Sequence, residues 1–431
     1  MKTSQNQSKS SLTRVLSLRN FRLLFAGSTT SLLGDQFTLI ATPWLVLQLT
    51  GDPLALGIVL ALEGIPRAVF MLLGGAITDR ISQRTVMIIA DVIRFLLTAL
   101  MAGLVLFGAI KMWMLYTFAL SFGLVAGFAI PAQNSIVPML VEERDLEAGN
   151  SIMMGITQLV GFLGPTIAGI LIGKFSDSLL GIGLAFGIDA FTFTVSAMSL
   201  WLMKLQIALK NILNTAGKEN VWQSIGVGIG YLWNDKVLRL MFLVLAAVNF
   251  LLMGPLMVGI PVLADVRLPE GAIAYGLLMS AFAGGNLIGF FMAGSLPHPN
   301  AGGMKAIVLV LIAAFGLVIA ALGFIPNTWV DFGLLFLLGL GNGYIAIILF
   351  TWMQKRTPKD MLGRMMSLIM LSNTGLTPIS QAIAGVVSKI DLTLLFVSAG
   401  LLVLLVVFVA AFQPELGAFA EGVVGTDISA N

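Results

Sequence analysis

Long apolar runs separated by short polar turns follow one another along almost the whole chain of 431 residues. About twelve of these runs have twenty or more residues, the length that an α-helix needs to cross a lipid bilayer. They lie near residues 20–48, 54–77, 85–108, 113–138, 150–173, 180–203, 240–263, 274–296, 303–325, 330–353, 366–388 and 392–412. The pattern therefore predicts an all-α membrane protein with twelve transmembrane helices.

A polar stretch between the sixth and seventh runs divides the predicted helices into two sets of six. Glycines recur at a constant offset, since Gly57 and Gly75 in the first set correspond to Gly276 and Gly294 in the second. Such a repeat is typical of transporters built from two pseudo-symmetric bundles. We expect two six-helix bundles, at residues 20–203 and 240–412, joined by a cytoplasmic linker with an amphipathic helix at 204–239. A cytoplasmic N-terminal segment, 1–19, and a cytoplasmic C-terminal tail, 413–431, complete the chain.

The composition supports this class, because 58% of the residues are hydrophobic and only 10% are charged. That is too apolar for a soluble domain. The Lys and Arg residues of the predicted loops fall mostly on one side, which the positive-inside rule makes the cytoplasmic side. We therefore expect a multi-pass protein of a bacterial-type inner membrane, with both termini in the cytoplasm and a first helix that is not a signal peptide.

Several kinds of chemistry are disfavoured by the sequence. It has no cysteine and one histidine, His298, so thiol chemistry and a metal cluster are not expected. It has no phosphate-binding Gly-x-x-x-x-Gly-Lys-Ser/Thr motif for ATP, and no basic stripe with interleaved aromatic residues for nucleic acid. We expect neither an enzyme nor a cofactor, and we expect the energy for the protein's activity to come from a gradient or from a partner.

Charged residues inside the predicted helices of the first set are the main candidates for function, because each is costly in a bilayer. Glu63 and Arg67 are four residues apart, and Asp91 and Arg94 are three apart, so each pair can neutralise itself on one helix face. A structural ion pair is the simpler interpretation of each. The alternative is a role for Asp91 and Arg94 in a gating network.

Asp35 and Asp189 have no basic residue within one helical turn on their own helices. Buried acids in membrane proteins usually mark ion pathways. We therefore predict Asp35 and Asp189, with Glu63 beside them, as proton-coupling residues. Hydrogen bonding of each acid to a neighbouring helix is the alternative.

A large apolar cavity with a few polar anchors is the expected substrate site. The second set offers amides and aromatic residues for it. The candidates are Phe37, Trp44, Arg67, Asn249, Met253, Phe282, Asn286, Phe350 and Asn373. For any single aromatic residue or methionine among them, ordinary helix packing or lipid contact is the simpler explanation.

Two motifs carry a resemblance to a known family. The turn after the second predicted helix reads Gly75-x-x-x-Asp79-Arg80-x-x-x-Arg84, and the fifth helix carries Gly161, Gly164-Pro165 and Gly169. The first resembles the loop motif of the major facilitator superfamily, and the second resembles its antiporter motif. The resemblance implies that Gly75, Asp79, Arg80 and Arg84 act in gating with Asp91 and Arg94, and that the fifth-helix residues pack against a neighbouring helix.

Within that superfamily, the surroundings of Asp35, Asp91, Arg94 and Asp189 resemble the third drug:proton antiporter branch, to which macrolide efflux proteins and enterobactin-type siderophore exporters belong. The resemblance implies a monomeric, proton-coupled exporter of a hydrophobic or amphipathic small molecule that works by alternating access. An uncoupled facilitator or a lysophospholipid flippase on the same fold is the nearest alternative. A non-transporting membrane receptor is a more distant one.

Overall fold

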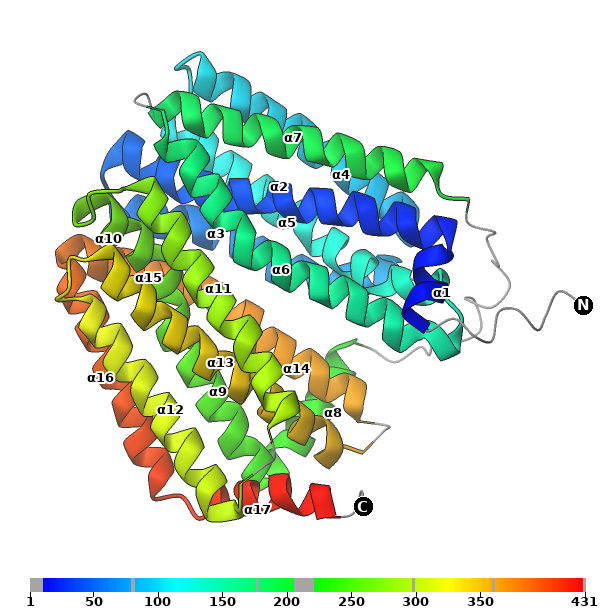
Figure 1. The fold of residues 1–431 in the computed structure, drawn as a ribbon, viewed down its shortest axis with the longest axis vertical. Helices are drawn as coiled ribbons and strands as arrows, with labels where there is room; N and C mark the ends of the chain where they lie inside the picture. Colours follow the sequence, from blue (N-terminus) through cyan, green and yellow to red (C-terminus); the bar gives the residue numbers. More distant parts are fainter. Residues whose placement is uncertain are drawn as a thin grey trace, which may run out of the picture. The chain divides into compact units, whose positions relative to one another are not determined.

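The computed structural model describes residues 11–78, 82–175, 178–204, 221–296, 299–358 and 361–428, and all regular structure in them is helical. Ten of the described helical segments are long and apolar enough to cross a membrane. Two further predicted spans correspond to α2 (Arg19–Thr50) and to the pair α14 (Leu362–Gly375) and α15 (Thr377–Ile390). Together these are the twelve segments that the hydrophobic pattern predicts (Figure 1).

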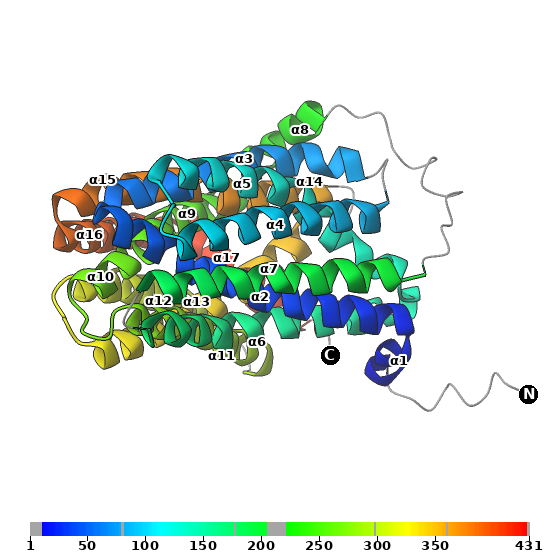
Figure 2. The same cartoon turned by 90° about the horizontal axis from the view of Figure 1, so that it is seen from above.

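The chain divides into two compact units, residues 1–49 with 62–217, and residues 50–61 with 218–431. The helices of the first unit are α1 (Ser11–Ser17), α2, most of α3 (Pro53–Thr78), α4 (Gln83–Leu106), α5 (Met112–Ile136), η1 (Val137–Met139), η2 (Glu143–Asp145), α6 (Leu146–Gly173) and α7 (Ser178–Leu202). Helices α4 and α7 pack along much of their length (Figure 2). This contact positions the charged residues described below.

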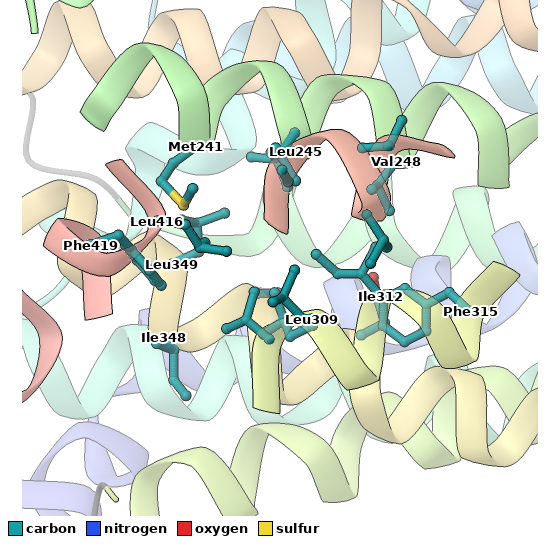
Figure 3. A pocket seen from close by; sticks show the side chains of 18 of the residues that line it. Met241, Leu245, Val248, Leu309, Ile312, Phe315, Ile348, Leu349, Leu416 and Phe419 are labelled. Carbon is teal, nitrogen blue, oxygen red and sulfur yellow. The ribbon is translucent and has the colours of Figure 1, made fainter. Parts of the chain in front are cut away.

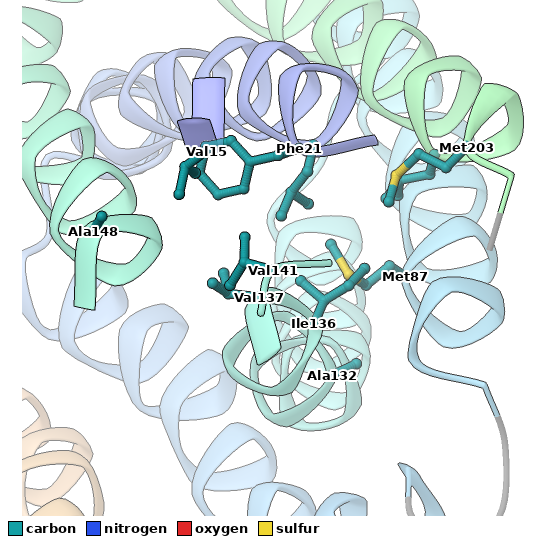
Figure 4. Packing of buried hydrophobic residues seen from close by; sticks show 11 residues of the cluster. Val15, Phe21, Met87, Ala132, Ile136, Val137, Val141, Ala148 and Met203 are labelled. Atoms are coloured by element: carbon teal, nitrogen blue, oxygen red, sulfur yellow. The ribbon is translucent and has the colours of Figure 1, made fainter. Parts of the chain in front are cut away.

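A cluster of buried apolar side chains packs together at one end of the first unit (Figure 4). Val15 of α1 and Phe21 of α2 are fully buried there against side chains from α4, α5, η1, α6 and α7. Beside it, Arg14 makes an ion pair of 2.7 Å with Asp145. The short helix α1 is therefore tied to the start of α6 by both apolar and charged contacts.

The second unit contains α8 (Val221–Asn234), α9 (Lys236–Gly254), η4 (Pro255–Gly259), α10 (Ile260–Val266), α11 (Ala272–Ser295), α12 (Ala301–Leu322), α13 (Thr328–Arg356), α14, α15, α16 (Leu392–Ala411) and α17 (Glu415–Ile428). Glycines bring α11 and α13 close together, because a Cβ atom on Gly285 or Gly339 would lie less than 3.0 Å from the backbone of the other helix. Asn342 of α13 donates a hydrogen bond of 3.1 Å to Asn286 of α11 across this contact.

Two predicted spans are not single α-helices. The span predicted at 240–263 contains a π-helical turn, Pro255–Gly259, where proline lacks the N–H that would continue the α-helix. The span predicted at 366–388 is broken at Leu376, shortly before Pro378. Next to both breaks, Ser380 accepts the N–H of Gly254 at 2.8 Å and donates to the carbonyl of Phe250. The side chain thus replaces part of the lost backbone bonding.

The residues predicted as a C-terminal tail also contain a helix, α17, which the sequence analysis did not predict. It packs against α9, α12 and α13 of the second unit (Figure 1). Its buried residues recur on one face, at Leu416, Phe419, Ala420 and Val423. That spacing is helical, but the run is too short to have been counted among the predicted spans.

The ion pair between Asp52 and Lys389 gives a first testable prediction. Lys389 Nζ lies 2.9 Å from Asp52 Oδ2, and this hydrogen bond lowers the pKa of Asp52 below its ordinary value. Both side chains are partly exposed, so we expect a contribution of at most about 1 kcal/mol. Because the folded-state pKa is lowered, this stability is present above the unfolded value of about 3.9 and is lost as the pH falls through the folded value.

Thermal unfolding of the detergent-solubilised protein tests the ion pair. We expect Asp52→Asn and Lys389→Gln each to lower the melting temperature slightly near pH 6. The difference from the unmodified protein should vanish at a pH below the folded-state pKa of Asp52. A deficit of equal size at both pH values would show that the pair itself contributes nothing.

Candidate functional site

Asp189 of α7 lies inside the first unit and is 1% exposed. Thr38 of α2 donates its hydroxyl hydrogen to Asp189 Oδ2, and Thr192 Oγ1 lies 3.4 Å from Asp189 Oδ1. The same Thr192 hydroxyl donates to the Asp189 carbonyl at 2.7 Å. The carboxylate is therefore directed toward α2, where Thr38 donates to one oxygen, while the Thr192 hydroxyl lies beside the other oxygen.

Gly34 allows α2 to approach this carboxylate. A Cβ atom at position 34 would come within 3.0 Å of both Thr192 Oγ1 and Asp189 Oδ1, a separation that real Cβ atoms essentially never show. No other residue type leaves that space empty. The Gly34-Asp35 dipeptide therefore places one acid on α2 directly beside the contact that holds the other acid on α7.

Asp35, Asp189 and Arg94 form one electrostatic group. The charges of Arg94 and Glu63 act on Asp35, and those of Asp35 and Arg94 act on Asp189. Arg94, on α4, also lies over the ring of Phe193, with 5.6 Å between its Cζ atom and the ring centroid. The structure thus places Asp35 and Asp189 within electrostatic reach of one cation, Arg94, which sequence spacing did not predict, whereas Glu63 acts on Asp35 alone.

The two pairs predicted from helical spacing differ. Glu63 and Arg67 make the expected ion pair, with 3.2 Å between Oε1 and Nη1. Asp91 and Arg94 do not come within ion-pair distance, so that expectation is wrong; Asp91 hydrogen-bonds with Ser196 instead. An i,i+3 spacing places two residues on one face, but Arg94 extends toward Phe193 and leaves the pair open.

Asp91 also lies at a shallow groove between α4 and α7, with a volume of about 360 Å³. The other lining residues are Ile88, Val92, Phe95, Phe193, Thr194, Ala197, Met198 and Trp201. Asp91 Oδ2 is buried without a hydrogen-bond partner in the described structure. One oxygen of this acid thus has no partner, although the carboxyl group also hydrogen-bonds with Ser196.

Among the predicted gating residues, Arg84 has the clearest contacts. It donates to the carbonyl oxygens of Leu200 and Trp201 at 2.7 Å each, in the last turn of α7. A cation at a helix C-terminus is favourable because the last carbonyls lack partners. Gly75 lies in the last turns of α3, whereas Asp79 and Arg80 lie outside the described residues. Arg84 thus joins the start of α4 to the end of α7.

The predicted antiporter motif lies on α6. A Cβ atom on Gly164 would come within 3.0 Å of the Gln36 side chain of α2, so α6 packs on α2 at this point. Pro165 and Gly169 are buried inside the helix. No described atom lies within 4 Å of a Cβ atom built on Gly161, so that glycine makes no close helix contact in this structure.

The second unit contains a cavity of about 60 Å³ between α9, α12, α13, α16 and α17 (Figure 3). Its lining is apolar except for Asn249, Asn342 and Tyr344. Asn249 donates to the carbonyl of Leu245 at 3.1 Å. A cavity of this size holds a few water-sized groups and is too small for a drug-sized molecule.

The other residues predicted to line a substrate cavity are spread over both units. Phe37 and Trp44 are buried in the first unit, and Met253 and Phe282 are half-buried in the second. Phe350 is 43% exposed. Asn373 is in α14, but its side chain lies outside the described structure. Of the whole set, Asn249 is the residue that lines the cavity of Figure 3.

Sequence reasoning missed Asp331, in the first turn of α13. Its side chain is fully buried, and neither carboxylate oxygen has a hydrogen-bond partner in the described structure. From sequence, the second set of helices has almost no charge near the middle of its spans. Asp331 was overlooked because it lies at the end of the predicted span 330–353. A carboxylate that is buried without a hydrogen-bond partner is costly, so the residue is a candidate for function.

Comparison with known proteins settles the family. The model of the Major Facilitator Superfamily matches residues 24–380. The chain belongs to this superfamily. The protein is 26% identical over 403 residues to the multidrug efflux pump Tap of Mycolicibacterium fortuitum, covering 91% of this chain and 95% of Tap. It is 24% identical over 388 residues to the enterobactin exporter EntS of Salmonella typhi, covering 85% of this chain and 84% of EntS.

Among solved structures, a mutant form of the nucleoside transporter NupG superimposes with a TM-score of 0.71. It is 14% identical in sequence, and the match covers 92% of this chain and all of the NupG chain. Such a likeness concerns the fold alone. The predicted twelve-helix major facilitator fold and the membership of this superfamily are therefore confirmed.

As a major facilitator protein, the chain is a multi-pass membrane transporter of a small molecule, in a family whose members are typically not enzymes. The described residues contain no group of three or more His, Cys, Asp or Glu side chains arranged to hold a metal ion.

Proposed function

We propose that this transporter is a proton-coupled exporter of a hydrophobic or amphipathic small molecule and works by rocker-type alternating access. The observation that carries the proposal is that Asp35 and Asp189 interact electrostatically with each other and with Arg94, while Asp189 is hydrogen-bonded across α2 and α7 within one unit. The substrate class is supported by the names of two relatives, a multidrug efflux pump and an enterobactin exporter.

Protonation would act through the balance of charge around Arg94. With Asp35 and Asp189 both ionised, two acids share one cation, and a proton on either acid removes one negative charge from a buried group. A change of that kind favours one conformation over another only if the group differs between the two conformations. Asp189 bridges α2 and α7, so movement of either helix changes its hydrogen bonds.

The remaining parts of the mechanism follow the family resemblance. Two six-helix bundles, 20–203 and 240–412, would rock about a central cavity lined by the predicted substrate residues. Asp79 and Arg80, with Gly75 and Arg84, would hold one gate at the cytoplasmic side. The proposal places both termini in the cytoplasm and the protein in the inner membrane as a monomer.

Transport by the purified protein in proteoliposomes tests the coupling. The probe is a lipophilic fluorescent cation, and the variable is an imposed pH gradient across the vesicle membrane. We expect substrate movement to follow the direction and size of the gradient and to collapse when a protonophore is added. Equal transport with and without the gradient would overturn proton coupling and leave a facilitator or a lysophospholipid flippase on the same fold.

A further inference from the structure

Helix α17 forms one wall of the cavity in the second unit (Figure 3). Leu416 and Phe419 line the cavity, and each is only 1% exposed. Ala420 and Val423 are buried on the same face of the helix. The three residues 412–414 separate α17 from the end of α16, so the helix is joined to the bundle by a very short connection.

One aromatic contact fixes α17 at its middle. The ring of Phe419 meets the ring of Trp352 edge-on at 4.8 Å, and a Cβ atom on Gly422 would lie 2.8 Å from Trp352 Nε1. Arg356 also lies 5.4 Å from the Trp352 ring and makes two hydrogen bonds to Asp235, of 2.7 and 3.2 Å. Trp352 therefore also has a contact, with Arg356, that does not involve α17.

The buried side chains of α17, Leu416, Phe419, Ala420 and Val423, are apolar. Within the described part of α17, neither Glu415 nor Glu421 makes an ion pair or a hydrogen bond with another helix. Apolar contact is not directional, so another apolar group of similar size can replace it. The two side chains that enter the cavity, an aromatic ring and a branched aliphatic chain, also show which kind of group fits there.

We propose that this cavity is a binding site for the apolar end of an amphipathic molecule and that α17 is a removable cap on it. Leu416 and Phe419 occupy space that the ligand takes when α17 moves away. The remaining volume of about 60 Å³ is too small for such a ligand in the capped state. The polar residues of the wall are Asn249, Asn342 and Tyr344, of which Asn249 donates to the Leu245 carbonyl and Asn342 donates to Asn286.

The inference rests on the proposed function only for the chemical class of the ligand. A cap that occludes the site lowers the apparent affinity by the fraction of time for which the site is open. Removing the cap therefore strengthens binding even in the absence of a gradient. The binding measurement tests the cap, and the gradient-driven transport measurement tests the proposed function. Either hypothesis can therefore be disproved without the other.

The test is binding of N-phenylnaphthylamine, a dye that fluoresces in apolar sites, to the full-length protein in phospholipid nanodiscs. We expect Phe419→Ala and deletion of residues 414–431 each to strengthen binding by about tenfold. Phe412→Ala is the matched control, because this ring is exposed and lies outside the cavity. Phe419→Ala keeps the proposal testable if the deleted protein does not fold.

A second substitution locates the bound dye. Leu245→Trp on α9 fills the cavity and should abolish the gain in binding that Phe419→Ala produces. The ligand is either a free amphiphile or a membrane lipid. Displacement of the dye by a dodecyl-chain cation indicates a free amphiphile, and displacement by a lysophospholipid indicates a membrane lipid. No gain on removal of the cap, a gain that survives Leu245→Trp, or displacement by neither compound would overturn the proposal.

Discussion

We expect Asp189→Asn to remove most pH-gradient-driven export while leaving the protein folded. The substitution keeps the size of the side chain and an oxygen that accepts the hydrogen bond from Thr38, so the α2–α7 contact persists. It removes the exchangeable proton from the most deeply buried member of the charged group. We expect the gradient-dependent rate in proteoliposomes to fall by about tenfold or more, because coupled transport needs a group that binds and releases a proton.

Two comparisons make this result specific. Asp35→Asn should give a loss of the same kind, whereas Glu143→Gln, at an exposed acid of the same unit, should have no effect. Exchange of substrate between the two sides without a gradient should survive in Asp189→Asn. If both Asp35→Asn and Asp189→Asn retain full gradient-driven transport, these acids are not the coupling residues, even if transport by the protein is proton-coupled.

The hydrophobic pattern predicts most of the fold because bilayer thickness sets the length of each helix. It also identifies the charged residues, since a carboxylate within an apolar run is conspicuous in sequence. It does not show which acids meet, because the contact of Asp189 with Thr38 joins positions 151 residues apart and depends on the missing side chain at Gly34. Asp91 and Arg94 show that spacing is also insufficient within one helix, because these two residues share a helix face but do not form an ion pair.

Other features depend on partners that sequence spacing cannot identify. Arg84 belongs to a motif associated with gating, yet in the structure it donates to carbonyl groups at the end of α7. The apolar face of α17 is too short to be recognised without α13 beside it, and Asp331 is unusual only because it is buried without a partner. To find these features from sequence, one would need to know which other helices bury each helix end and each short apolar run.

The remaining large effect is expected at Gly34. In Gly34→Ala, the new methyl group comes within 3.0 Å of Thr192 Oγ1 and Asp189 Oδ1, so α2 and α7 must separate or the carboxylate must turn away. Overpacking of this kind typically costs about 1–3 kcal/mol of stability. We expect a lower melting temperature in detergent, together with the loss of gradient-driven transport that Asp189→Asn shows.

Two variants separate this contact from a general intolerance of larger residues. Gly161→Ala adds the same methyl group to another membrane helix at a position with no described atom within 4 Å, so it should change neither stability nor transport. Adding Thr192→Ala to Gly34→Ala removes the hydroxyl group that the new methyl meets and should restore part of the melting temperature. If Gly34→Ala is as stable and active as Gly161→Ala, α2 does not need to lie against Asp189, and the carboxylate is not held in the way that the proposed coupling requires.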